Sequence, residues 1–130
     1  MDARKGHYPY QARLDAYGNL GFRFAEMSHR GSLLCLPTGM HAWAVTGPDE
    51  LTLDAFAPVL AVADRLEILL IGMGETFRPL PAALKQAFRD HGIVAEPGST
   101  GSMARTYNVL FAEERAVGAA LIAVADAGGR

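Results

Sequence analysis

The chain has 130 residues and a mass of 13.9 kDa, which is the usual length of one domain and enough to bury a core without disulfides. Half of its residues are hydrophobic and 20% are charged, a composition that excludes an intrinsically disordered chain. Twelve Lys and Arg face 14 Asp and Glu, for a net charge of −2. We therefore expect no nucleic-acid partner, because that class of protein needs a basic surplus to neutralise phosphates.

The apolar runs of the sequence are short. The longest, at residues 117–125, falls far below the roughly 20 residues that a transmembrane helix needs, so we expect a chain that does not span a membrane. The first residues lack the apolar stretch of a secretory signal. Cys35 is the only cysteine, so no intramolecular disulfide can form. We therefore expect a cytoplasmic protein.

The first half of the chain has the pattern of short β-strands. Strands are predicted at residues 10–15, 20–24, 33–36 and 41–46, where apolar residues alternate with polar ones or form short runs. Gly18-Asn19 predicts a hairpin between the first two strands, and Pro37-Thr38-Gly39 predicts a turn between the last two. Cys35 lies in the apolar run of the third strand, so a buried thiol is expected.

The second half alternates helices and strands. The pattern predicts helices at residues 52–64, 80–91 and 103–114, and strands at 67–72, 93–96 and 116–125. Thr52 is placed to cap the first helix, but Pro58 falls inside it, so we expect a kink or two short helical pieces. Pro81 and Gly92 mark the start and the end of the second helix. The apolar run at 67–72 indicates a central strand.

This order of elements defines an α/β fold with a mixed sheet. Successive strand–helix–strand units in the second half favour parallel neighbours, of βαβ type, whereas the hairpins of the β-rich first half favour antiparallel ones. The pattern also allows the first half to form a second, small sheet. We expect a single domain over residues 10–125, with flexible tails at 1–9 and 126–130.

Two glycine-bearing loops follow the predicted strands 67–72 and 93–96. In open α/β sheets, ligands bind at the carboxyl ends of the strands, and helix N-termini there favour anions. The candidate ligand-binding residues are Gly72, Gly74, Thr100, Ser102, Arg105 and Asn108. Each also has an ordinary structural role open to it, since glycines permit tight turns, hydroxyl side chains cap helices, and Arg or Asn side chains pair within a fold.

The sequence contains no recognisable catalytic motif. It has neither a G-x-S-x-G elbow nor an H-E-x-x-H motif, and no two of the four histidines, at positions 7, 29, 41 and 91, have the close spacing of metal ligands. We therefore expect no metal and no cofactor, and we assign no catalytic residue.

Several segments resemble one known family. They are GSLL at 31–34, LPTG at 36–39, EILLIGMG at 67–74, RTYNVL at 105–110 and GAALI at 118–122. Residues 18–124 are similar to a small family of domains of unknown function that includes the mitochondrial complex I assembly factor 3 and bacterial single-domain proteins. The resemblance implies a three-layer α/β sandwich around a mixed sheet. Asn108 matches the family motif, whereas the mitochondrial members lack a match to Arg105.

Two functional hypotheses follow. The resemblance implies a non-enzymatic protein-interaction or assembly factor, with a respiratory or membrane complex as its client. Such a protein would bind an unidentified protein partner through an exposed apolar patch, for which Trp43, Phe56 and Phe77 are the candidates, although a lone tryptophan more often belongs to a core. The alternative is a small-molecule or anion-binding protein, an enzyme included, with its site at the two glycine loops. The sequence is also compatible with a homodimer.

Overall fold

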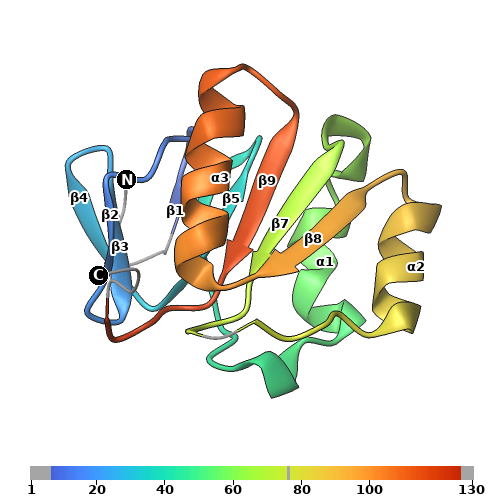
Figure 1. Cartoon of the computed structure of the whole chain (residues 1–130). Coiled ribbons are helices and arrows are strands. Elements are labelled where there is room, and N and C mark those ends of the chain that lie inside the picture. Colours follow the sequence, from blue (N-terminus) through green and yellow to red (C-terminus); the bar gives the residue numbers. More distant parts are fainter. Residues whose placement is uncertain (1–6, 76, 127–130) are drawn as a thin grey trace.

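The computed structural model describes residues 7–75 and 77–126, which form a six-stranded sheet and a three-stranded sheet (Figure 1). In spatial order, the large sheet contains β1 (His7–Tyr8), β6 (Gly39–Trp43), β5 (Ser32–Leu36), β9 (Val117–Leu121), β7 (Ile68–Gly72) and β8 (Val94–Gly98). The small sheet contains β2 (Ala16–Gly18), β3 (Gly21–Phe24) and β4 (Met27–Arg30). The α-helices are α1 (Ala57–Leu60), α2 (Ala82–Asp90) and α3 (Thr100–Ala112).

The large sheet is mixed, as predicted. Strand β9 lies between its two parts, because it pairs antiparallel with β5 and parallel with β7. On one side of β9, the strands β5, β6 and β1 are antiparallel; on the other, β7 and β8 are parallel. The two halves of the chain, with their different sequence patterns, therefore meet at β9.

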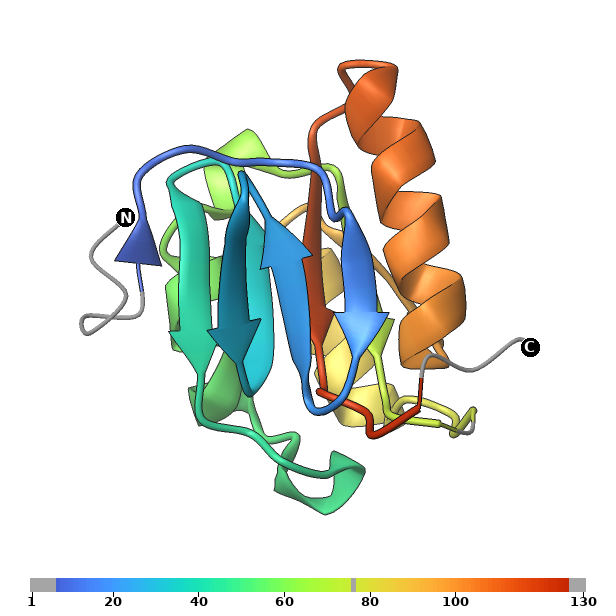
Figure 2. The same cartoon turned by 90° about the vertical axis from the view of Figure 1, so that its left-hand side faces the viewer.

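Each face of the large sheet is covered, which gives the three layers that the resemblance implies. Helices α1 and α2 cover one face, while α3 and the small sheet lie side by side on the other (Figures 1 and 2). The core between the large sheet and helices α1 and α2 is called the first core, and the core between the sheet and α3 with the small sheet is called the second core. Side chains along β5 alternate between them: Leu34 and Leu36 enter the first core, and Leu33 and Cys35 enter the second. All five residues of β5 are buried, as expected for a strand covered on both faces.

The N-terminal half departs from the predicted strand positions. The first hairpin forms, but it joins β2 to β3, and its turn residues Asn19 and Leu20 both have positive φ, as a two-residue type I′ turn requires. Strand β4 was not predicted, because the turn before it is Ala25-Glu26, again with positive φ at both residues but without the glycine or asparagine that signals such a turn. Residues 10–15 belong to no described strand, although the N–H of Asp15 donates to the carbonyl of Arg23 in β3 at 2.8 Å.

The predicted tails differ partly from the structure. His7 and Tyr8 fall within the predicted N-terminal tail, but they pair with His41 and Met40 as an edge strand of the large sheet. Residues 1–6 and 127–130 lie outside the described part of the chain.

Pro58 divides the predicted helix 52–64, as expected. A 3₁₀ helix, Leu53–Phe56, begins at Thr52, whose side chain accepts a hydrogen bond from the N–H of Ala55. Helix α1 then starts with Pro58 in its first turn, where proline has no hydrogen bond to lose. No helix in the described part of the chain is both long and apolar enough to cross a lipid bilayer.

Candidate functional site

The two glycine-bearing loops meet at Thr100, whose side chain is fully buried. Its hydroxyl donates a hydrogen bond to the carbonyl of Ile122 at 2.7 Å and accepts one from the N–H of Gly74 at 3.1 Å. Its own N–H donates to the carbonyl of Gly74 at 2.8 Å. Thr100 therefore connects the first turn of α3 to the ends of both β7 and β9, and its polar groups bond within the protein.

The structure also explains why glycine occupies two positions of the first loop. A Cβ atom on Gly72 would lie 2.8 Å from the Cα of Thr100, so only glycine permits this approach of β7 to α3. Gly74 has a φ of +107°, a conformation that glycine adopts without steric cost. Ser102 lies in the first turn of α3, and its N–H donates to the hydroxyl of Ser99, the N-cap, at 3.2 Å.

Asn108 holds the segment that precedes β2. Its side-chain amide donates to the carbonyl of Leu14 at 2.8 Å and its side-chain oxygen accepts from the N–H of Leu14, also at 2.8 Å. The preceding residue, Tyr107, donates from its hydroxyl to the carbonyl of Ala12 at 2.7 Å. At Ala12 and Leu14, side chains of α3 therefore take the place of a neighbouring strand as partners of the backbone.

The structure thus brings five of the six predicted ligand-binding residues close to internal partners. Arg105 differs, because its side chain is exposed and makes no hydrogen bond or ion pair with any residue that the structure describes. The contacts of Gly72, Thr100 and Asn108 match the structural roles that the sequence left open. Ligand binding at these loops stays a prediction.

Two of the three aromatic candidates for a surface patch are in the core. Phe56 is fully buried, so the prediction was wrong for it, and Trp43 is 8% exposed, which agrees with the core position that is more common for a lone tryptophan. The indole N–H of Trp43 donates to the carbonyl of Ala55 at 2.8 Å, and Phe56 lies between the rings of Trp43 and Phe88. Phe77, by contrast, is 61% exposed, as predicted.

Cys35 is buried in the second core, as its apolar neighbours predicted. Burial raises the pKa of the thiol far above its usual range, although a hydrogen bond with Tyr107 opposes the shift. A thiol in this state is a poor nucleophile, because the thiolate is the reactive form. Among the described residues, no group of three or more His, Cys, Asp or Glu side chains could hold a metal ion.

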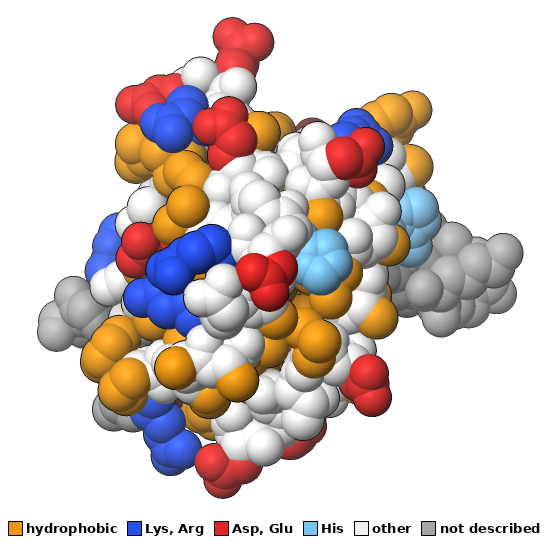
Figure 3. Space-filling view, turned by 90° about the vertical axis from the view of Figure 1, so that its right-hand side faces the viewer, with side chains coloured by type: hydrophobic (Ala, Val, Ile, Leu, Met, Phe, Trp, Pro, Cys, Tyr) orange, Lys and Arg blue, Asp and Glu red, His pale blue; other side chains and the backbone are white. Residues whose placement is uncertain are grey.

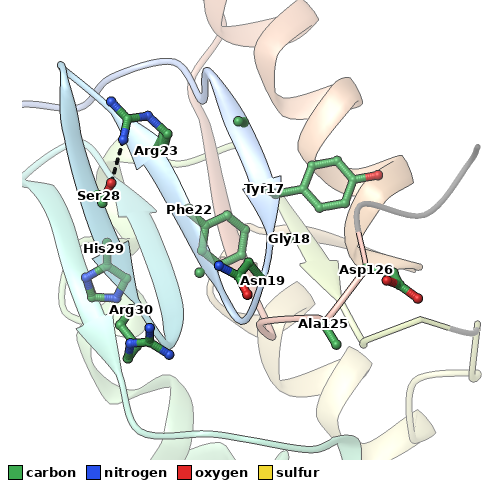
Figure 4. Close-up of a pocket in the computed structure, with 12 residues that line it drawn as sticks. Tyr17, Gly18, Asn19, Phe22, Arg23, Ser28, His29, Arg30, Ala125 and Asp126 are labelled. Carbon is green, nitrogen blue, oxygen red and sulfur yellow. Dashed lines mark hydrogen bonds between the residues drawn. The ribbon is translucent and has the colours of Figure 1, made fainter.

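A pocket of about 740 Å³ lies at the small sheet (Figure 4), a size typical of ligand sites. It is lined by Ala16, Tyr17, Gly18, Asn19, Gly21, Phe22, Arg23, Ser28, His29, Arg30, Ala125 and Asp126. The guanidinium of Arg23 donates to the hydroxyl of Ser28 at 2.6 Å. His29 contacts the carbonyl of Ser32 through Nε2 at 2.9 Å, and since a carbonyl only accepts, Nε2 carries the hydrogen.

Sequence reasoning missed this pocket. Its lining comes from three strands and from the segment after β9, and one of those strands, β4, was not predicted. With β4 unrecognised, Arg30 could not be placed beside β3. The available signal was the alternation at residues 27–30, where Met and His alternate with Ser and Arg.

The fold and these contacts define a class: a small α/β sandwich in which a Tyr-Asn pair on α3 holds the N-terminal segment against the sheet. Residues 14–122 match the family model described as a protein of unknown function (DUF498/DUF598). The chain belongs to this family, which confirms the resemblance.

Known relatives agree with this assignment. An uncharacterised protein of Rhodobacter capsulatus is 43% identical over 84% of this chain and 82% of its own length. The human NADH dehydrogenase [ubiquinone] 1 alpha subcomplex assembly factor 3 is 32% identical over 84% of this chain, which spans 59% of that longer protein. A crystal structure described as an outer membrane protein from Bartonella henselae has a TM-score of 0.87 and 47% identity, covering 91% of this chain and 99% of that one.

Proposed function

We propose that the chain is a non-enzymatic protein-binding factor that assists the assembly of a respiratory complex of the NADH dehydrogenase type. The observation that carries the proposal is the 32% identity with the human assembly factor over 84% of this chain. The family match runs from residue 14, before β2, to residue 122, after β9, and so includes every described element of the sandwich except the edge strand β1. An assembly role would therefore reside in the sandwich itself.

Exposed apolar side chains are the candidate contacts for a protein partner. Tyr10 and Phe77 are 68% and 61% exposed, and Val94 and Val109 are similarly accessible. On the side of the molecule that carries β8 and α2, hydrophobic side chains are interspersed with charged ones (Figure 3). Aromatic side chains such as those of Tyr10 and Phe77 are common anchors in protein interfaces.

The test is capture of the partner from the organism's own cells. The full chain carries an affinity tag, is crosslinked in living cells, and is recovered with its neighbours for mass spectrometry. We expect subunits of NADH dehydrogenase to be enriched over a tag-only control, and deletion of the gene to lower the amount of assembled complex on native gels. An unchanged amount of complex, with no subunit enriched, would refute the proposal.

The same proposal places the chain in the cytoplasm, in line with its single thiol at Cys35. Cell fractionation with an antibody against the untagged chain tests this location. Recovery in the periplasmic or outer-membrane fraction would contradict it.

A further inference from the structure

The outer face of the small sheet carries two arginines. Phe22 and Phe24 of β3 are buried in the second core, so Arg23, which lies between them, projects from the opposite face. The register pairs Arg23 with Ser28 and Gly21 with Arg30. Arg23 and Arg30 are therefore diagonal neighbours on one exposed face of the sheet.

These arginines give the pocket a local positive charge on a chain whose net charge is −2. Neither guanidinium has an ion-pair partner in the part of the chain that the structure describes. Asp126 supplies a carboxylate to the lining, so two positive side chains stand against one negative one. Charge complementarity favours an anionic ligand, and guanidinium groups suit carboxylates because of their paired N–H donors.

The spacing of the two arginines favours an elongated ligand. In Figure 4, the guanidinium groups of Arg23 and Arg30 point away from each other. Diagonal neighbours in a sheet have Cα atoms about 7–8 Å apart, so the diverging guanidinium groups are separated by more than that. An extended peptide places alternate side chains on one side at intervals of about 6.6–6.8 Å. Carboxylates repeated along one side of such a peptide can therefore reach both arginines.

Two glycines lie beside the arginines on the small sheet. Gly18 and Gly21 pair across β2 and β3, and both line the pocket. Gly21 is buried, but Gly18 is partly exposed and projects no side chain, so a ligand can approach the sheet closely at Gly18.

We propose that this face of the small sheet binds an extended acidic segment of a protein partner, with carboxylates at alternate positions paired with Arg23 and Arg30. The inference rests on the proposed function, because it names the surface and the chemistry through which an assembly factor would hold its client.

The test is an NMR titration of the full-length, ¹⁵N-labelled protein at low salt. The probe is the peptide Gly-Glu-Gly-Glu-Gly-Glu-Gly, and its matched control has Gln in place of Glu. We expect the acidic peptide to shift the backbone amide signals of β2, β3 and β4, and the Gln peptide to leave them unchanged. Added salt is expected to weaken the binding.

Variants of the protein test the two arginines. The double variant Arg23→Gln, Arg30→Gln is expected to bind the acidic peptide about tenfold more weakly. Arg65→Gln, which removes one positive charge from an exposed 3₁₀ helix outside the pocket, is expected to bind normally. Because all three residues are exposed, the variants should retain the native spectrum, and the Gln peptide tests the charge pairing without any change to the protein.

Three results would overturn the inference. One is the absence of shifts with millimolar acidic peptide, and another is equal weakening by Arg65→Gln. The third is saturation by succinate or inorganic phosphate at the same concentrations, which would make the pocket a small-anion site. If the peptide fails to bind while NADH dehydrogenase subunits are still captured, only the docking surface is refuted. If the peptide binds and no subunit is captured, the proposed function is refuted instead.

Discussion

The side chain of Asn108 binds Leu14 as a neighbouring β-strand would. It donates to the Leu14 carbonyl and accepts from the Leu14 N–H, both at 2.8 Å. One side chain on α3 thus satisfies both backbone groups of a residue 94 positions away in the sequence. This relationship gives a structural reason for the asparagine in the RTYNVL motif, and it leads to a direct stability test.

Asn108→Ala is expected to lower the free energy of unfolding by about 1–3 kcal/mol, because it leaves the partly buried N–H and carbonyl of Leu14 without partners. Urea unfolding monitored by circular dichroism measures the change. Val109→Ala, on the exposed side of the same helix, is the matched control and should change stability by less than about 0.5 kcal/mol. Equal effects of the two substitutions would show that the paired hydrogen bonds contribute nothing.

Thr100→Val is expected to destabilise the fold by about 1–3 kcal/mol. The substitution keeps the shape of the side chain but removes the hydroxyl that bonds to Ile122 and Gly74. Thr100→Ser, which retains the hydroxyl, should lose only about 1 kcal/mol for the missing methyl group. Thermal unfolding compares the two variants. A larger loss for Ser than for Val would mean that packing, and not hydrogen bonding, determines this position.

Gly72→Ala is expected to cost about 1–3 kcal/mol, because the new Cβ would lie 2.8 Å from the backbone of Thr100. Gly47→Ala is the control: its nearest atom is a side-chain oxygen of Glu50 at 3.9 Å, and its φ is −156°. That substitution should be neutral or slightly stabilising. Denaturant unfolding of the pair measures the difference, and a neutral Gly72→Ala would contradict the close approach of β7 to α3.

Stability is expected to fall as the pH drops below about 6.5. Burial lowers the pKa of His41 from its ordinary value of 6.5, and the charge of His7, whose ring stacks on it at 4.5 Å, lowers it further. Below pH 6.5 the unfolded chain therefore binds more protons at this site than the folded chain, which favours unfolding. The loss begins near the unfolded pKa and levels off below the lowered folded pKa.

Urea midpoints at pH 7.5, 6.5 and 5.5 measure this dependence. His41→Gln should flatten the profile over that range, because the titrating ring is removed while a polar side chain remains. His91→Gln provides the control, since that histidine lies in the exposed C-cap of α2. An unchanged pH profile in His41→Gln would show that the ring does not govern stability here.

The sequence predicted those elements whose signals are local. The apolar run of β7 and the residues Pro81 and Gly92 around α2 mark their elements without reference to the rest of the chain. Helix α3 starts at Thr100, three residues before its predicted start, because Ser99 is the N-cap and several residues of that loop could have served. Strand β8 continues through Pro97, which is tolerated because β8 lies at an edge of the sheet.

Features that depend on contacts between distant segments could not be predicted. The alternation at residues 41–46 placed Trp43 on the opposite face of the predicted strand from Ala42 and Ala44. It could not show that Phe56 would pack against the Trp43 ring. Nor could it show that Asn108 would be bound to Leu14, since only the folded chain brings α3 beside residues 10–15. The pocket at the small sheet depends in the same way on β4, whose turn has no sequence signature.

The position of β9 has a consequence for how the protein is made. Among the described strands it is synthesised last, yet it joins the antiparallel and the parallel parts of the sheet. During synthesis, β5 and β7 therefore lack the neighbour that connects them until residues 117–121 have been made. A nascent chain stalled before residue 117 should remain open to proteases and chaperones, whereas a chain that extends past β9 allows the two parts to combine.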